Sequence, residues 1–165
     1  MIKRLAGCVR QYKKASILTP IFMVLEVTME VIVPLLMARL IDYGIDKGDM
    51  GYITKMGVVL VIACLMSLSF GALSGKFAAI ASAGFAKNLR HDMYYNVQNF
   101  SFSNIDKFST ASIVTRLTTD VTNLQNSYQM IIRIAVRAPM ILLFSLIMAF
   151  TINARLGCIF LLAIP

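Results

Sequence analysis

Long apolar runs constrain this sequence more than any other feature. Between residues 56 and 85 the only charged residue is Lys76. About 20 predominantly apolar residues in a helix are enough to cross the hydrocarbon core of a bilayer. The composition agrees, because 58% of the residues are hydrophobic and 15% are charged, against about 45–50% and about 25% in soluble domains. We therefore predict an integral membrane protein.

The apolar runs have the length of membrane helices. We predict an all-α polytopic membrane fold in which long transmembrane helices extend into the cytoplasm. The predicted segments are a polar N-terminal segment at 1–16, spans at about 17–43 and 52–86, the second extending to 100, a helix at 113–152 that enters the membrane near 133, and a partial span at 155–165.

The basic residues are distributed unevenly about these runs. The chain carries a net charge of +8, and five basic residues without any acid precede the first run. In the following loop Asp46, Lys47, Asp49 and Lys55 sum to zero. This asymmetry follows the positive-inside rule, so we predict a multi-pass protein of the cell membrane with a cytoplasmic N-terminus. It also argues against a nucleic-acid partner, which requires a basic face on the protein.

Charged residues interrupt two of the membrane helices. Glu26 and Glu30 are four residues apart, so they share one face of the first helix. Glu26 lies about 14 Å along the helix from Ile17. Carboxylates at such depth face a cavity or a partner. Two interpretations stay open: contact with a cationic substrate or a proton, or ion pairing with Arg133 and Arg137.

Small residues recur at every fourth position of the second long helix. Such a row lets two helix backbones approach closely within a bilayer. We predict that it is a helix-packing face. Its members are Ser67, Gly71, Gly75, Ala79 and Ala83.

No group of residues predicts catalysis or metal binding. Cys8, Cys64 and Cys158 are far apart and form neither a disulfide framework nor a zinc motif. The run 71–77 has the wrong spacing for a phosphate-binding loop and follows no strand. His91 stands alone among charged residues, which is typical of a solvated side chain. We therefore assign no catalytic residue, metal or cofactor to this chain.

The order of these elements resembles the transmembrane domain of type I exporters of the ATP-binding cassette (ABC) family. Residues 88–125 resemble the first intracellular loop of that family, and the resemblance covers essentially the whole chain. The family usually has Thr-Gly where this chain has residues 110–112 as Thr-Ala-Ser. The residues that match the loop motif are Arg90, Thr115, Arg116, Leu117 and Asp120.

The resemblance implies a short coupling helix that docks on a nucleotide-binding domain. ATP and Mg²⁺ would be bound by that domain, and a second transporter half would complete the pathway for an exported substrate. The whole transporter would be an ATP-hydrolysing translocase, whereas this piece contains no ATPase site. The coupling helix would comprise Ser103, Asn104, Ile105, Asp106, Lys107, Phe108, Ser109 and Thr110.

The alternative function is a small multidrug antiporter that exchanges protons for substrate through Glu26 or Glu30. An antiporter of this kind requires four short spans without long cytoplasmic helices. The roughly sixty polar-tending residues between Lys76 and Arg137 argue against it.

Overall fold

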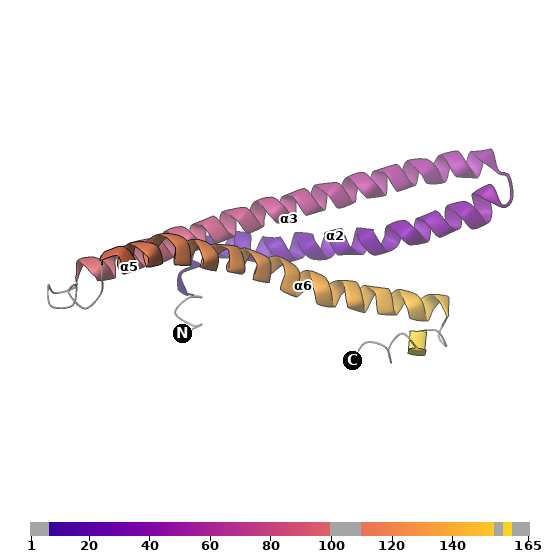
Figure 1. The fold of residues 1–165 in the computed structure, drawn as a ribbon. Helices are drawn as coiled ribbons and strands as arrows, with labels where there is room; N and C mark the ends of the chain where they lie inside the picture. The colour runs from indigo at the N-terminus through magenta and orange to yellow at the C-terminus, as the bar shows by residue number, and fades with distance from the viewer. Residues whose placement is uncertain (1–6, 100–109, 154–156, 160–165) are drawn as a thin grey trace. The chain divides into compact units, whose positions relative to one another are not determined.

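The computed structural model describes residues 7–99, 110–153 and 157–159, and every regular element in them is a helix. The all-α prediction is therefore confirmed for this part of the chain. Figure 1 shows the order of the elements. They are η1 Arg10–Tyr12, α2 Lys13–Leu40, η2 Ile41–Ile45, α3 Met50–Gln98, α5 Thr110–Thr115, η3 Arg116–Asp120 and α6 Val121–Ile152.

Helix α3 is one uninterrupted helix of 49 residues. At 1.5 Å per residue it is about 74 Å long, more than twice the roughly 30 Å of a hydrocarbon core. The sequence explains this length, because residues 50–98 contain no proline and no cluster of glycines that would end a helix. At least half of α3 must therefore lie outside the hydrocarbon.

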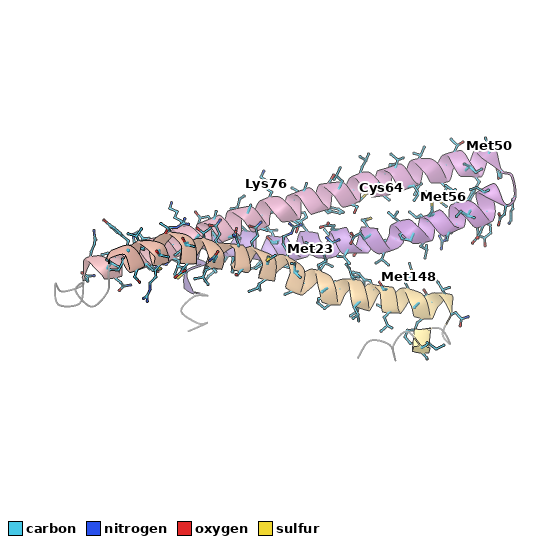
Figure 2. All side chains as sticks on the ribbon, in the orientation of Figure 1. Met23, Met50, Met56, Cys64, Lys76 and Met148 are labelled. Atoms are coloured by element: carbon cyan, nitrogen blue, oxygen red, sulfur yellow. The ribbon has the colours of Figure 1, made fainter. Side chains whose placement is uncertain are left out.

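Three helical stretches are long and apolar enough to cross a membrane: Arg10–Ile45, Met50–Gln98 and Ala111–Ile152. Figure 2 shows Met56 and Cys64 on the apolar part of α3, with Lys76 near the middle of the helix. Cys64 is exposed, as expected of a side chain that faces lipid or another span. The predicted polytopic membrane fold is thus confirmed.

Two prolines lie inside α2 without ending it. The α-helix continues through both Pro20 and Pro34, and a kink at Pro34 stays a prediction from the sequence. A wider, π-helical turn follows at Ile41–Ile45. Within a bilayer a missing proline hydrogen bond is tolerated where neighbouring groups satisfy the freed carbonyl.

The connection between α2 and α3 is short and well defined. The backbone N–H of Tyr52 donates to Oδ1 of Asp49 at 3.1 Å, which caps the first turn of α3. The rings of Tyr43 and Tyr52 lie 6.3 Å apart, and Nζ of Lys47 lies 4.5 Å from the Tyr43 ring centre. These aromatic and cationic groups are typical of the membrane–water interface.

The chain divides into two compact units. The first unit comprises Met1–Thr19 with Gly75–Arg133, and the second comprises Pro20–Ser74 with Ile134–Pro165. The boundary crosses α2, α3 and α6, so each long helix contributes to both units. The first unit contains the residues that match the loop motif of Sequence analysis, and the second contains the most apolar parts of the long helices.

The first unit has a small apolar core. It consists of Cys8, Phe85, Ala86, Leu89 and Val121, with Val9, Met93 and Tyr128 packed against it. The Phe85 and Tyr128 rings stack with centroids 4.7 Å apart, a favourable separation for aromatic pairs. Residues before α2 are thereby joined to α3 and α6.

Polar contacts hold the N-terminal residues of the first unit against α3. The Arg10 guanidinium donates to the Asp92 carboxylate at 3.0 and 3.1 Å. Asn88 Nδ2 donates to the Cys8 carbonyl at 2.7 Å. Arg10 has a φ of 36°, a left-handed conformation that costs energy for a residue with a side chain. The ion pair to Asp92 helps to offset that cost.

The row of small residues in α3 is only half covered within this chain. Ala79 and Ala83 are exposed, whereas Ala78 and Ser82, one position earlier, are fully buried. A Cβ atom at Gly84 would clash with ring carbons of Tyr12, so glycine at this position lets the Tyr12 ring pack directly against the backbone of α3. A packing role for the Ala79 and Ala83 face therefore stays a prediction.

The Cys8 thiol provides a test of the first unit. Burial, followed by the negative charge of Asp92, raises the pKa of Cys8. The thiolate is the reactive species. We therefore expect N-ethylmaleimide to alkylate Cys8 slowly at neutral pH. The alkylation rate should increase only at a higher pH than the rate of an unperturbed cysteine does. Asp92→Asn should move this rate profile to lower pH.

The rates are measured by mass spectrometry in a variant in which Cys64 and Cys158 are replaced by serine. The matched control is Asp120→Asn, which removes an exposed carboxylate of the same unit. An unchanged profile in Asp92→Asn would contradict the contact between the N-terminal residues and α3.

Candidate functional site

The residues that match the loop motif lie on three elements of the first unit. Arg90 is on α3, Thr115 ends α5, and Arg116, Leu117 and Asp120 lie in η3. Arg90 Nη2 donates to Oγ1 of Thr122, the second residue of α6, at 3.1 Å. The structure therefore joins the two long helices at the motif, through a threonine that the motif does not include.

The motif coincides with a change in helix geometry. Residues Arg116–Asp120 form a π-helical turn between α5 and α6. Thr115 and Thr118 donate their hydroxyl groups to the carbonyls of Ala111 and Val114, at 3.0 and 2.8 Å. Such hydroxyl bonds bend helices, and π-helical turns are frequent at functional sites. Hydropathy does not predict this turn, because it leaves the polarity pattern unchanged.

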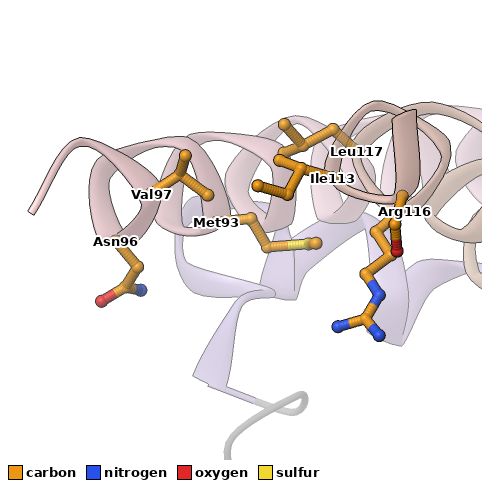
Figure 3. Close-up of a pocket in the computed structure, with 7 residues that line it drawn as sticks. Met93, Asn96, Val97, Ile113, Arg116 and Leu117 are labelled. Atoms are coloured by element: carbon orange, nitrogen blue, oxygen red, sulfur yellow. The ribbon is translucent and has the colours of Figure 1, made fainter. Parts of the chain in front are cut away.

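A cavity of about 210 Å³ lies beside this turn, and both motif residues Arg116 and Leu117 line it. Figure 3 shows Met93 and Val97 of α3 on one side and Ile113 and Leu117 on the other. Its wall combines this apolar surface with the polar side chains of Asn96 and Ser112, and Arg116 is the charged residue among the lining residues. A docked partner would find both an apolar and a cationic contact here.

The predicted coupling helix lies almost entirely outside the described residues. Positions 103–109 are not described, and for Thr110 only the backbone is, at the start of α5. Phe100 also lies outside the described part of the chain. The coupling role therefore stays a prediction, and the cavity beside η3 does not test it.

A second group of predicted residues meets in the second unit. Arg137 on α6 contacts both glutamates of α2, with Nη1 3.4 Å from Glu26 Oε1 and Nη2 2.5 Å from Glu30 Oε1. The Glu26 side chain is 14% exposed and the Glu30 side chain 42% exposed. One guanidinium is therefore shared by two carboxylates, an inner one and an outer one.

The inner carboxylate is packed against the backbone of α3. A Cβ atom at Gly71 would lie 3.0 Å from Glu26 Oε1, so glycine at this position leaves room for the carboxylate. Oε2 of Glu26 is buried without a hydrogen-bond partner among the described residues. The sequence predicts Gly71 only as part of a packing row, and its place beside Glu26 depends on tertiary structure.

This group holds two acidic side chains and one basic side chain. Both carboxylates contact the single guanidinium of Arg137, and charged side chains at membrane depth are costly without such a partner. Arg133, the other predicted partner, belongs to the first unit, and its Nε is buried without a hydrogen-bond partner in the described part of the chain.

The described residues contain no group of three or more His, Cys, Asp or Glu side chains that could hold a metal ion. The N-terminal contact of Arg10 with Asp92 was not predicted from the sequence. Its only sequence signal is an acid in a basic stretch, beside His91, whose Nδ1 lies 3.5 Å from Asp92 Oδ1. That signal does not identify Arg10, 82 residues away in the sequence, as the partner of Asp92.

Comparison with known proteins decides the family. Residues 16–165 match the ABC transporter transmembrane region. The chain belongs to this family. The predicted resemblance is thus confirmed over nearly the whole sequence, including both long helices and the loop motif.

Relatives of this ABC transporter transmembrane region are named as ABC transporter ATP-binding proteins or as ATP-dependent flippases. It is 35% identical to the ABC transporter ATP-binding protein YfiB of Bacillus subtilis, over 88% of this chain and 25% of that protein. It is 25% identical to the ABC transporter ATP-binding protein MT1311 of Mycobacterium tuberculosis, over 95% of this chain and 27% of that protein. With the ATP-dependent lipid A-core flippase of Pseudoalteromonas translucida it shares 26% identity, over 99% and 28% of the two chains.

The chain spans about a quarter of the length of the curated relatives it matches. Membership in the family and the three candidate spans make it a multi-pass membrane protein. Both groups of site residues described above therefore belong to a membrane-spanning region, and the Glu26, Glu30 and Arg137 group lies on helices that cross the bilayer.

The shared guanidinium is tested by a double-mutant cycle. Arg137→Gln leaves two carboxylates without a cation, so we expect it to destabilise the protein, and Glu26→Gln should relieve part of that loss. The expected coupling energy between the two positions is about 0.5–3 kcal/mol. It is measured from unfolding in mixed micelles with increasing detergent denaturant.

The matched control is Arg39→Gln, an exposed arginine of α2 for which the described residues provide no ion pair. It should couple to Glu26→Gln by less than about 0.3 kcal/mol. Additive effects of Arg137→Gln and Glu26→Gln would exclude an energetically significant ion pair.

Proposed function

We propose that this chain is part of the membrane-spanning domain of an ATP-driven exporter, in which it forms a portion of the substrate pathway. Family membership over residues 16–165 carries the proposal. The relatives that bear the name ATP-dependent lipid A-core flippase support a role in transport.

The dimensions of the helices support a lever function. α3 exceeds the hydrocarbon core by more than twofold, and the Ala111–Ile152 stretch has 42 residues. Inside the first unit, the Arg90–Thr122 bond and the stack of Phe85 on Tyr128 tie these extensions together. A rigid extension transmits a small displacement at its end to the membrane helices as a hinge or rocking motion.

The proposed partners follow from the same reasoning. A nucleotide-binding domain would bind ATP and Mg²⁺ and would dock near residues 103–110, which come between α3 and α5. The names of the relatives include an ATP-binding function, which supports such a domain. A second transporter half would complete the enclosure of the pathway, as membership in the family implies.

The antiporter alternative loses its basis. It requires short spans joined by short loops, whereas α3 alone has 49 residues. The match to the ABC transporter transmembrane region covers the chain that would have to form the antiporter.

The proposed orientation places the N-terminus and residues 103–110 in the cytoplasm. In a cysteine-free background, Asp46→Cys should be labelled in intact cells by an impermeant maleimide, because Asp46 lies exposed in the α2–α3 connection. Asn104→Cys should be labelled only after the membrane is permeabilised. Labelling of Asn104→Cys from outside would invert the topology and end the coupling assignment.

Coupling is tested at Phe108, the predicted apolar contact of the coupling helix. In the assembled transporter, Phe108→Ala should reduce ATP-dependent transport in vesicles by about tenfold or more, a loss of roughly 1.4 kcal/mol of docking energy. Binding of a fluorescent ATP analogue should be retained. The matched control is Tyr94→Ala, which removes an exposed aromatic ring of α3. Equal transport by the two variants would refute docking through Phe108.

A further inference from the structure

Three lysines of the first unit border the apolar runs of α2 and α3. Lys13 and Lys14 come just before the run that begins at Ile17, and Lys76 is the first charged residue after Lys55 on α3. All three residues are exposed, and none of the ion pairs in the described part of the chain includes them. These residues, here called the lysine collar, therefore carry positive charges that no described carboxylate neutralises.

The lysine collar lies close to one end of the hydrocarbon core. Lys76 is about 30 Å along α3 from Met56, where the apolar run begins, and that distance matches the thickness of the core. On α2 the apolar run begins at Ile17, one turn after the two lysines of that helix. A lysine thus marks the end of each apolar run, at the level where lipid headgroups begin.

Contacts inside the first unit bring the lysines of the two helices to a similar level. The Tyr12 ring packs against the backbone of α3 at Gly84. Helices α2 and α3 are antiparallel (Figure 1), so the two lysines that follow Tyr12 lie opposite residues just before Gly84. Lys76 is about 12 Å from Gly84 along α3. Because a lysine stem extends along apolar surface until its ammonium group reaches a polar partner, all three lysines can reach one layer of headgroups.

Exposed isoleucines accompany the lysines on both helices. Ile17 is 61% exposed and lies one turn from Lys13 and Lys14. Ile80 is 41% exposed and lies one turn from Lys76. Residues three or four apart share a helix face, so each face presents aliphatic surface beside an ammonium group. A phospholipid satisfies both, because its acyl chains contact the isoleucine while its headgroup contacts the lysine.

The other end of α3 differs in its balance of charge. Lys55 is also exposed there, but Asp46 and Asp49 balance it together with Lys47. Around the lysine collar, by contrast, residues 13–19 and 75–86 include no acid. Basic side chains next to a bilayer attract anionic lipids. The excess of positive charge that selects such lipids is therefore found at the collar and not at the opposite end of the helix.

We propose that the lysine collar binds anionic phospholipids in preference to zwitterionic ones. A headgroup of net negative charge lies beside the collar lysines, and the acyl chains pack against Ile17 and Ile80. This lipid site goes beyond the proposed export function and does not depend on it, because lipid binding requires neither ATP nor an exported substrate.

A fluorescent reporter beside the lysines tests the proposal. In the assembled transporter, with its native cysteines replaced by serine, bimane is attached to Ile80→Cys or to Ile17→Cys. Nanodiscs of phosphatidylcholine receive increasing fractions of nitroxide-labelled phosphatidylglycerol, or of nitroxide-labelled phosphatidylcholine with the same acyl chains. Phosphatidylglycerol should reach half of its maximal quenching at an about fivefold lower mole fraction, the preference expected for one basic side chain near the membrane surface.

Removal of the positive charges should abolish this preference. Lys76→Gln should make the two lipids quench the reporter at Ile80 equally, and the double variant Lys13→Gln/Lys14→Gln should do the same at Ile17. Quenching by phosphatidylcholine is measured in every variant. It distinguishes a lost preference for charge from a lost contact with lipid or a misfolded protein.

The matched control is Lys55→Gln, which removes an exposed lysine at the other end of α3 and should leave the preference at Ile80 unchanged. A reporter at Val58→Cys, a position that is 55% exposed and one turn from Lys55, should be quenched equally by the two lipids. Equal quenching at Ile80 without any charge removal, or an unchanged preference in Lys76→Gln, would overturn the proposal. Quenching by neither lipid would do so too, because another part of the transporter would then cover the collar.

Discussion

A bilayer supplies no hydrogen-bonding partner for the backbone, and the rest of this structure depends on that constraint. A chain that crosses the hydrocarbon must satisfy its own amide and carbonyl groups, and a helix does so within a single segment. Every regular element of the described residues is accordingly helical, and α2 remains helical through two prolines. Helical continuity then carries α3 for 49 residues, far beyond the membrane.

The same constraint changes what holds the helices together. Between spans the lipid is as apolar as the side chains, so packing and polar contacts matter more than the hydrophobic effect. In the second unit the Arg137 guanidinium joins α6 to two acids of α2, and Gly71 lets α3 approach one of them. In the first unit an apolar core around Phe85 and Val121 contributes as it does in soluble proteins.

The polar contacts also give each unit its chemical character. In the first unit the ion pair of Arg10 with Asp92 and the bond of Arg90 to Thr122 are complete contacts that position helices. In the second unit one guanidinium, that of Arg137, is shared by the carboxylates of Glu26 and Glu30. Charged side chains at membrane depth are costly without a partner, so this shared contact is what allows two acids on α2.

The sequence by itself determined the type, order and approximate length of the helices, the depth of Glu26 and Glu30, and the family, because hydropathy and helical period are local properties of the chain. Only the tertiary structure decided which contacts those helices make. It made Arg137 the partner of both acids, and it buried Ala78 and Ser82 in the first unit. A shift of one residue turns a helix face by about 100°, and that rotation is set by neighbouring helices rather than by the sequence pattern of one.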